Sequence, residues 1–94
     1  MAYATYPFLS ASDRLKRSVF MKGAVIEGFK EKVWRRDICG HAMKYVEHGV
    51  EGKFGWEIDH IKPVADGGGD ELSNLQPLWW ENNRNKGDNY PWSG

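Results

Sequence analysis

The chain has 94 residues, which is enough for one domain with a modest core. Its 13 basic and 13 acidic residues cancel, which argues against a generic nucleic-acid-binding protein, and its 14% of aromatic residues argues against disorder. A single cysteine, Cys39, excludes an internal disulfide, and no apolar run reaches membrane-spanning length, so we expect a cytoplasmic protein without a membrane segment or signal peptide.

The charges are distributed unevenly along the chain. Up to Lys44 there are nine basic and four acidic residues, a net charge of +5, whereas from Tyr45 onward four basic and nine acidic residues give −5. A basic part joined to an acidic part that can bind a cation suits a metal-dependent enzyme acting on a polyanion. Any single one of these charges could equally belong to an ordinary solvated surface.

Residues 1–40 predict a mainly helical, basic part of the chain. Ser10 or Ser12 can cap a first helix, whose apolar residues recur at helical spacing until Gly23 ends it. Residues 24–28 form a short apolar segment flanked by glycines, which predicts a connector or a brief strand. A second short helix is predicted over residues 29–36.

Arg35 and Cys39 follow as two candidates for special roles. Arg35 could reach a phosphate or could only pair with Asp37, and the sequence leaves both open. Cys39 precedes His41, which invites a metal-binding interpretation, but a structural zinc site needs four ligands and the chain has one cysteine. Cys39 is therefore predicted to be a small buried hydrophobic residue.

A hairpin and a loop are predicted in the middle of the chain. Residues 43–46 alternate in polarity and residues 54–61 are rich in strand-forming types, with glycine-rich turn sequence between them. We expect these two segments to pair. A surface loop with tight turns follows over residues 62–73.

The last elements are a strand and a helix. Residues 75–79 predict a short strand, and a final helix should begin at Trp80 or Glu81 and end at Lys86, with Gly87 as its C-cap. The order strand, loop, strand, helix brings the end of the first strand close to side chains of this helix.

Asp59, His60 and Asn83 therefore form a candidate metal and catalytic site. Asp59 offers a carboxylate oxygen and Asn83 an amide oxygen, which are hard ligands of the kind that Mg²⁺ prefers, with Mn²⁺ as a substitute. Neutral His60 could accept a proton from water as a general base.

Three more residues could support this site. Asn74 could hydrogen-bond the loop or His60, and Lys86 and Arg84 could meet phosphate charge. Each has a simpler interpretation alone, such as a turn residue or a solvated helix residue. The joint order and spacing, with Asn74 lying 14 residues after His60 and 9 residues before Asn83, favour a common site.

Four segments carry a resemblance to a known family. They are Ile58-Asp59-His60-Ile61-Lys62-Pro63, Gly67-Gly68, Asn74-Leu75-Gln76 and Asn83-Arg84-Asn85-Lys86-Gly87. Together they resemble the HNH endonuclease motif of the ββα-metal (His-Me finger) nucleases, over about a third of the chain. Residues 33–37 and 55–56 are also similar to the small stand-alone bacterial or phage type.

The resemblance implies an α+β fold in a single domain over residues 1–94. Its centre would be a ββα-metal core over residues 54–88, with the N-terminal helices packed against it. The implied partner is DNA, and a homodimer or a larger nuclease or packaging complex is a further expectation, because no recognition helix is evident.

The resemblance also implies roles for individual residues. Asp59 and Asn83 would hold one divalent cation, His60 would be the general base, and Asn74 would position the His60 loop. Lys86 matches the usual basic position. The implied activity is hydrolysis of DNA phosphodiester bonds to 5′-phosphate and 3′-hydroxyl ends; the alternative is a catalytically silent HNH-fold module for DNA binding or assembly.

Two departures from the family pattern matter. Asn83 stands where the family often has His, which gives a His-Asn-Asn variant whose oxygen ligands favour Mg²⁺ over Zn²⁺ or Ni²⁺. Many relatives also hold a structural zinc with two CxxC pairs, whose positions are here reduced to Cys39 with Ala42 and to Trp79 with Asn82. We expect no structural zinc, and aromatic packing by Trp79, with Trp56 as a further candidate, in its place.

Overall fold

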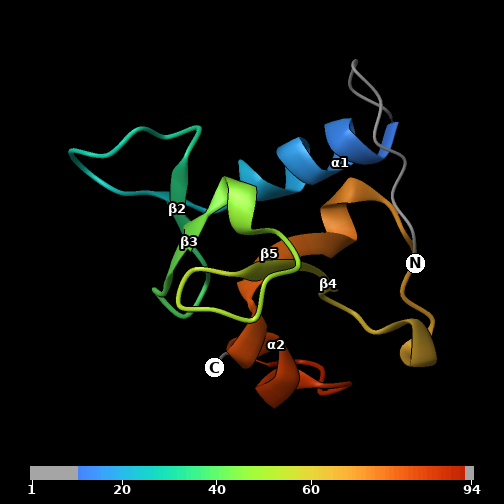
Figure 1. Ribbon diagram of the computed structural model, residues 1–94. Helices are drawn as coiled ribbons and strands as arrows, with labels where there is room; N and C mark the ends of the chain where they lie inside the picture. Colours follow the sequence, from blue (N-terminus) through green and yellow to red (C-terminus); the bar gives the residue numbers. More distant parts are fainter. Residues whose placement is uncertain (1–10, 93–94) are drawn as a thin grey trace.

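The computed structural model describes residues 11–92, and its centre is two antiparallel strands followed directly by a helix. Strand β4 (Trp56–His60) pairs with β5 (Leu75–Trp79), and α2 (Trp80–Lys86) begins at the residue after β5. Figure 1 shows α1 (Ala11–Phe20) on one side of this two-stranded sheet and α2 on the other. The sheet therefore separates the two helices.

The alternation of side chains along β4 explains this arrangement. Successive residues of a strand point to opposite faces. Trp56 and Ile58 pack with the core on the α1 side, whereas Glu57 and Asp59 contact side chains of α2. The polar face of β4 is thus the face that α2 covers.

A second sheet of three short strands lies beside the first. It has the order β1 (Ala24–Val25), β2 (Trp34–Arg36) and β3 (Ala42–Lys44), all antiparallel. Three short 3₁₀ turns complete the elements: η1 (Tyr45–Glu47), η2 (Val64–Asp66) and η3 (Leu72–Asn74).

The core is built where α1 meets both sheets. It consists of fully buried apolar side chains from four elements: Val19, Phe20, Met43, Trp56 and Leu75. The rings of Phe20 and Trp56 lie 5.0 Å apart, and the indole N–H of Trp56 donates to the carbonyl of Tyr45. Because large aromatic side chains bury much area, this small chain stabilises its fold with few residues.

Several predicted elements are confirmed. The first helix ends before Gly23, a brief strand follows at Ala24–Val25, β5 covers the predicted residues, and α2 begins at Trp80. Gly87 ends α2 with a positive φ of 52° and donates its N–H to the carbonyl of Asn83. A left-handed backbone at this position favours glycine.

The predicted helix over residues 29–36 is wrong. The chain makes one turn, in which the N–H of Trp34 donates to the carbonyl of Lys30, and then extends into β2. The aromatic Trp34 suits a strand, and pairing on both sides of β2 outweighs the local helical spacing.

The predicted hairpin between residues 43–46 and 54–61 is also wrong. Strand β3 pairs with β2, and β4 pairs with β5, so the two predicted partners belong to different sheets. Alternation alone does not identify the partner of a strand. Strand β4 pairs instead with β5, in a register that sets Ile58 opposite Pro77 and keeps the apolar side chains of β4 on the buried face.

Cys39 differs from its prediction as well, because it is exposed. Partial desolvation and the nearby charge of Asp37 raise the pKa of its thiol, which keeps the sulfur protonated. Within residues 11–92, neither helix is long and apolar enough to cross a membrane.

Candidate active site

The end of β4 and the middle of α2 line one cavity of about 360 Å³. Asp59 and His60 reach it from β4, and Asn83 reaches it from α2. Pro63 and Gly87 also line it. Because β5 leads directly into α2, the helix is set against the polar face of β4, and three of the residues singled out from the sequence line the same space.

The Asp59 carboxylate is buried, with 7% of the residue exposed, and donors hold both of its oxygens. Oδ1 lies 3.3 Å from the ammonium of Lys86, and Oδ2 accepts a hydrogen bond of 3.0 Å from Gln76 Nε2. Gln76 stands opposite Asp59 in the register of β4 and β5. Two strands and the helix therefore fix the orientation of this carboxylate.

Lys86 is buried rather than exposed to solvent. Only 1% of it is exposed, and its ammonium donates to the main-chain carbonyl of His60 at 2.9 Å while it pairs with Asp59. Phosphate contact was predicted for this residue from its position in the motif. In the structure its ammonium pairs with Asp59 and with the His60 carbonyl, and so it links α2 to the end of β4.

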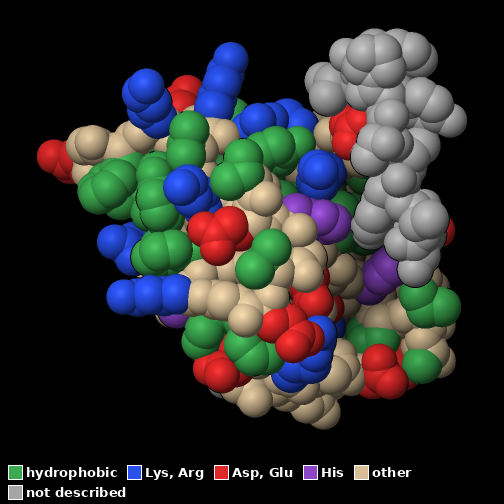
Figure 2. Space-filling view, viewed as in Figure 1, with side chains coloured by type: hydrophobic (Ala, Val, Ile, Leu, Met, Phe, Trp, Pro, Cys, Tyr) green, Lys and Arg blue, Asp and Glu red, His purple; other side chains and the backbone are tan. Residues whose placement is uncertain are grey.

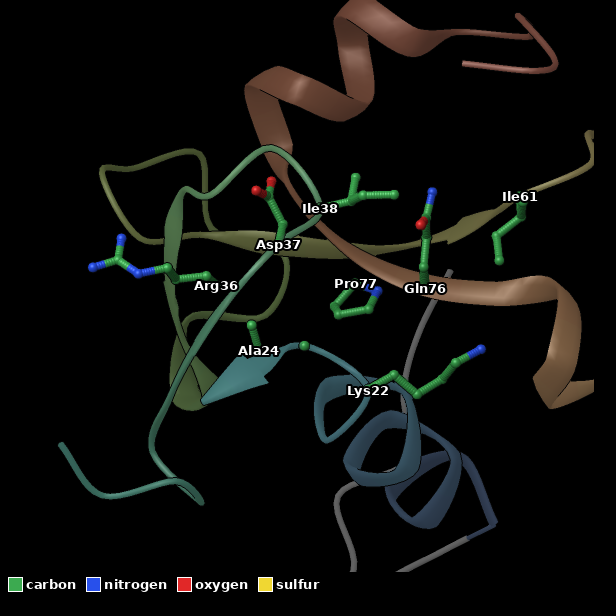
Figure 3. Close-up of a pocket in the computed structure, with 9 residues that line it drawn as sticks. Lys22, Ala24, Arg36, Asp37, Ile38, Ile61, Gln76 and Pro77 are labelled. Atoms are coloured by element: carbon green, nitrogen blue, oxygen red, sulfur yellow. The ribbon is translucent and has the colours of Figure 1, made fainter. Parts of the chain in front are cut away.

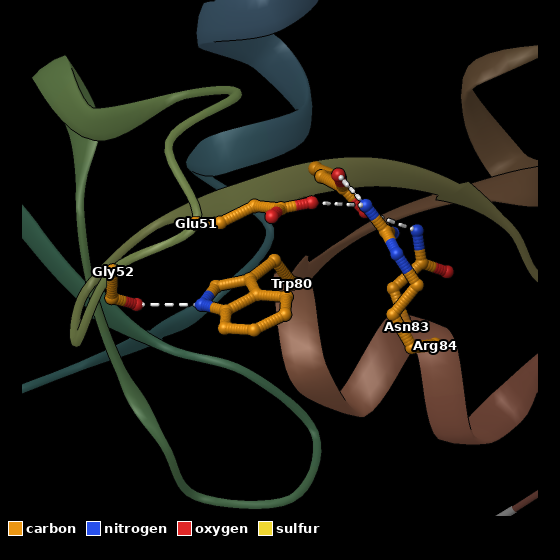
Figure 4. A network of polar contacts seen from close by, with 6 residues as sticks. Glu51, Gly52, Trp80, Asn83 and Arg84 are labelled. Carbon is orange, nitrogen blue, oxygen red and sulfur yellow. Dashed lines mark hydrogen bonds and ion pairs between the residues drawn. The ribbon is translucent and has the colours of Figure 1, made fainter.

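Asn83 is oriented by a carboxylate two residues before Asp59. Its Nδ2 donates to Glu57 Oε1 at 2.7 Å, which leaves its amide oxygen as the acceptor that can serve the cavity. In Figure 4 the amide nitrogen of Asn83 points toward that hydrogen bond and the amide oxygen points away from it. Glu57 thus determines which end of the amide is available as a ligand.

Arg84, also predicted to meet phosphate, is engaged by two carboxylates. It donates to both oxygens of Glu57, at 2.6 and 3.0 Å, and to Glu51 at 3.1 Å (Figure 4). Partial burial alone would raise the pKa of Glu57, but the hydrogen bonds from Arg84 and Asn83 and the charge of Arg84 lower it. Glu57 therefore stays ionised and holds two neighbouring side chains of α2.

Asn74 closes the loop that follows His60. Its side chain accepts from the N–H of Lys62 at 2.9 Å and donates to the carbonyls of Lys62 and Gly69 at 3.0 and 2.9 Å. Gly68 fits inside this loop only because it has no side chain, since a Cβ there would lie 1.7 Å from the Lys62 oxygen. Of the two partners left open for Asn74, the loop is the one it contacts.

His60 carries a partner that the sequence did not indicate. Its Nε2 lies 2.7 Å from Oδ1 of Asp70, an exposed residue of the same loop. Glu57 and Gln76 were also missed. Strand alternation from Asp59 would have found Glu57, and the register of β4 with β5 would have found Gln76, but Asp70 depends on the path of the loop.

Arg35 and Asp37 brace the fold away from the cavity. Arg35 is 7% exposed and donates to the carbonyls of Glu31, Met21 and Gly23, so its guanidinium connects β2 to the end of α1. Its guanidinium donors are thus used within the fold, and the phosphate contact considered from the sequence stays a prediction. Asp37 is also buried, with 5% of the residue exposed, and it connects a different pair of segments.

Asp37 joins the turn after β2 to the start of α2. Its Oδ1 accepts from the N–H groups of Cys39 and His41, and its Oδ2 accepts from the Trp79 N–H and the Asn82 side chain. The His41 ring also stacks on Trp79 at 3.7 Å. A buried carboxylate and a ring stack therefore connect the turn after β2 to the end of β5 and the start of α2.

A second cavity, of about 270 Å³, lies between the α1–β1 connection and β5 (Figure 3). Its walls include Ile38, Ile61 and Pro77, and Gln76 reaches it from β5. Since Gln76 also donates to Asp59, this cavity borders the support of the active site. Charged residues line it as well, namely Lys22, Arg36 and Asp37.

The donors in the first cavity fit a hard divalent cation. Asp59 supplies a carboxylate oxygen and Asn83 an amide oxygen, with room in the cavity for water or phosphate oxygens. Across residues 11–92, no three His, Cys, Asp or Glu side chains group closely enough to hold a metal ion. The candidate site therefore depends on the amide of Asn83 as well as on acidic ligands.

Comparison with known proteins agrees with this arrangement. A family model described as HNH endonuclease matches residues 39–89, which is more than half of the chain and includes β4, the loop, β5 and α2. No curated protein and no solved structure matches the chain. HNH nucleases generally act on DNA with a divalent metal. With its match covering the whole strand–loop–strand–helix unit, the chain belongs to the HNH endonuclease family.

Proposed function

We propose that the protein is a metal-dependent endonuclease that hydrolyses DNA phosphodiester bonds with one divalent cation, Mg²⁺ by preference. The observation that carries this proposal is the single cavity lined by Asp59, His60 and Asn83. A base beside two oxygen ligands suits hydrolysis of a phosphodiester, because water must lose a proton as it attacks phosphorus.

Each residue of the cavity has a distinct task in this mechanism. Asp59 and Asn83 would hold the cation, which when bound supplies positive charge against the phosphate and the leaving 3′ oxygen. His60 accepts the proton of the attacking water. Asn74 keeps the loop beside His60 in place through its three hydrogen bonds to Lys62 and Gly69.

The distribution of charge supports DNA as the substrate. Most of the Lys and Arg side chains on the face shown in Figure 2 lie over α1 and the three-stranded sheet, whereas acidic side chains are more frequent near β4 and α2. A basic surface beside an acidic, cation-binding site attracts a polyanion and still leaves room for the metal. Mn²⁺ is expected to replace Mg²⁺, because both prefer oxygen ligands.

The experiment is a cleavage assay on supercoiled plasmid with Mg²⁺, Mn²⁺ or EDTA. Wild-type protein should nick or cut the plasmid with either metal and not with EDTA, and His60→Ala should abolish cleavage while it keeps the wild-type circular dichroism spectrum. His48→Ala, which changes a histidine outside this cavity, is the matched control and should cleave normally.

Two results would contradict the proposal. Full activity of His60→Ala would exclude His60 as the base. Metal-independent DNA binding by wild-type protein, without cleavage of supercoiled, linear or single-stranded DNA, would favour the catalytically silent module instead.

A further inference from the structure

We propose that Asp70 is a positioning residue of the nuclease, which fixes the His60 imidazole so that its Nδ1 is the atom that takes the proton from water. The inference rests on the proposed function of His60 and assigns a role to the exposed end of the glycine-rich loop. It starts from the 2.7 Å contact between His60 Nε2 and Asp70 Oδ1.

The chemistry of the two groups determines where the imidazole proton lies. An ionised carboxylate can only accept hydrogen bonds, so His60 Nε2 must be the donor. A neutral imidazole carries one proton, and with that proton on Nε2 the lone pair is on Nδ1. The contact with Asp70 therefore selects both the tautomer and the ring orientation.

The loop holds Asp70 in place although its side chain is 90% exposed. Asn74 donates to the carbonyl of Gly69, the residue directly before Asp70, at 2.9 Å. The N–H of Gly68 donates to the carbonyl of Pro63, and the crowding around Gly68 leaves this backbone little alternative. Asn74 consequently acts on His60 through the loop backbone and the carboxylate of Asp70.

Asp70 has a second effect at the moment of proton transfer. As the water O–H bond breaks, the proton forms a bond with His60 Nδ1 and the resulting hydroxide forms a bond to phosphorus. The bond between phosphorus and the 3′ oxygen breaks at the same time, and the departing 3′ oxygen takes a proton from solvent water. The imidazole then carries a positive charge, which the Asp70 carboxylate stabilises without accepting a proton itself. This arrangement of base and orienting carboxylate serves the reaction and adds little to the stability of the fold, because exposed ion pairs contribute little.

The test combines kinetics of three loop variants with the wild type. Asp70→Ala should lower kcat about 10- to 100-fold, the usual effect of removing the partner that orients such a histidine. Its KM for DNA should stay the same or fall, because one negative charge is removed. Asp70→Asn keeps an oxygen acceptor and should recover part of the lost kcat.

Asp66→Ala is the matched control, since it removes one exposed carboxylate from the same loop without touching His60. If Asp70 acted only through its charge, Asp66→Ala and Asp70→Ala would have equal kcat values, and that result would overturn the inference. Unchanged melting temperatures in both variants are expected from their exposure.

Nitrogen-15 NMR of His60 in the metal-free and DNA-free protein provides a readout that needs no activity. At a pH where the ring is neutral, the wild type should show the separated shifts of a pure Nε2–H tautomer, and Asp70→Ala should show averaged shifts. Averaged shifts in a wild type that cleaves DNA would overturn the role of Asp70 alone. A pure tautomer in a wild type that does not cleave DNA would overturn the nuclease function and, with it, a catalytic role for the pair.

Discussion

Lys86 donates a hydrogen bond of 2.9 Å to the main-chain carbonyl of His60, and by this contact the last turn of α2 is attached to the residue proposed as the base. The same ammonium lies 3.3 Å from Asp59, and only 1% of Lys86 is exposed. A single buried cation thus sets the position of the proposed ligand and of the proposed base. It also neutralises Asp59 before any divalent cation binds.

Lys86→Met should therefore destabilise the protein severely. Removing one partner of a buried ion pair leaves the other charge uncompensated, which costs about 3–5 kcal/mol. Thermal or urea unfolding of the variant measures this loss.

The double variant Lys86→Met with Asp59→Asn separates charge from packing. Since no uncompensated carboxylate remains in it, it should regain part of the stability that Lys86→Met loses. If the stability lost by the double variant equalled the sum of the losses of Lys86→Met and Asp59→Asn measured separately, the ion pair would not be the reason for the loss.

The lowered pKa of Glu57 implies that the stability of the fold depends on pH in the acid range. Its burial favours a higher pKa, but hydrogen bonds from Arg84 and Asn83 and the Arg84 charge bring the folded-state pKa below the ordinary value of 4.5. A carboxyl group with a depressed folded pKa stabilises the fold above its unfolded pKa, and this stabilisation disappears as the pH falls through the folded pKa. The wild type should thus lose stability as the pH drops below about 4.5.

Glu57→Gln is the variant that isolates this effect. It keeps an oxygen acceptor for Asn83 but has no group to titrate, so its melting temperature should fall less than that of the wild type between about pH 5 and pH 3. Parallel melting curves of the two proteins over that range would show that Glu57 does not contribute to the acid sensitivity.

The arrangement of the cavity could be predicted because its determinants are local. Asp59 and His60 end a strand that strand-forming residue types predict, and Gly87 marks the end of α2. Because α2 follows β5 without a loop, the helix can cover only one side of the sheet. The order of these elements suffices to bring Asn83 to Asp59 and His60.

What could not be predicted depends on partners far away in the sequence. Arg84 is paired with Glu57, 27 residues earlier, and Lys86 with His60, 26 residues earlier, and neither partner is revealed by the position in the motif. Phosphate contact stays a prediction for both residues. Trp34 likewise belongs to a strand because β1 and β3 pair on its two sides, which local helical spacing does not reveal.

Asp37 gives the last prediction, which concerns the connection between the two halves of the fold. Its carboxylate accepts four hydrogen bonds, two of them from the turn that contains Cys39 and His41 and two from Trp79 and Asn82 at the start of α2. Asp37→Ala would leave these part-buried N–H groups without their acceptor, at up to about 1–3 kcal/mol for each. A loss of about 3 kcal/mol or more in the free energy of unfolding is expected from urea denaturation.

Two further variants define the reason for that loss. Asp37→Asn keeps one oxygen acceptor and should lie between the wild type and Asp37→Ala, whereas Cys39→Ser, an exposed change in the same turn, should leave stability nearly unchanged. Equal losses in Asp37→Asn and Asp37→Ala would mean that the charge of Asp37, and not its number of acceptors, holds the turn to α2. A stable Asp37→Ala would show that the stacking of His41 on Trp79 suffices, and that the carboxylate is not what connects these segments.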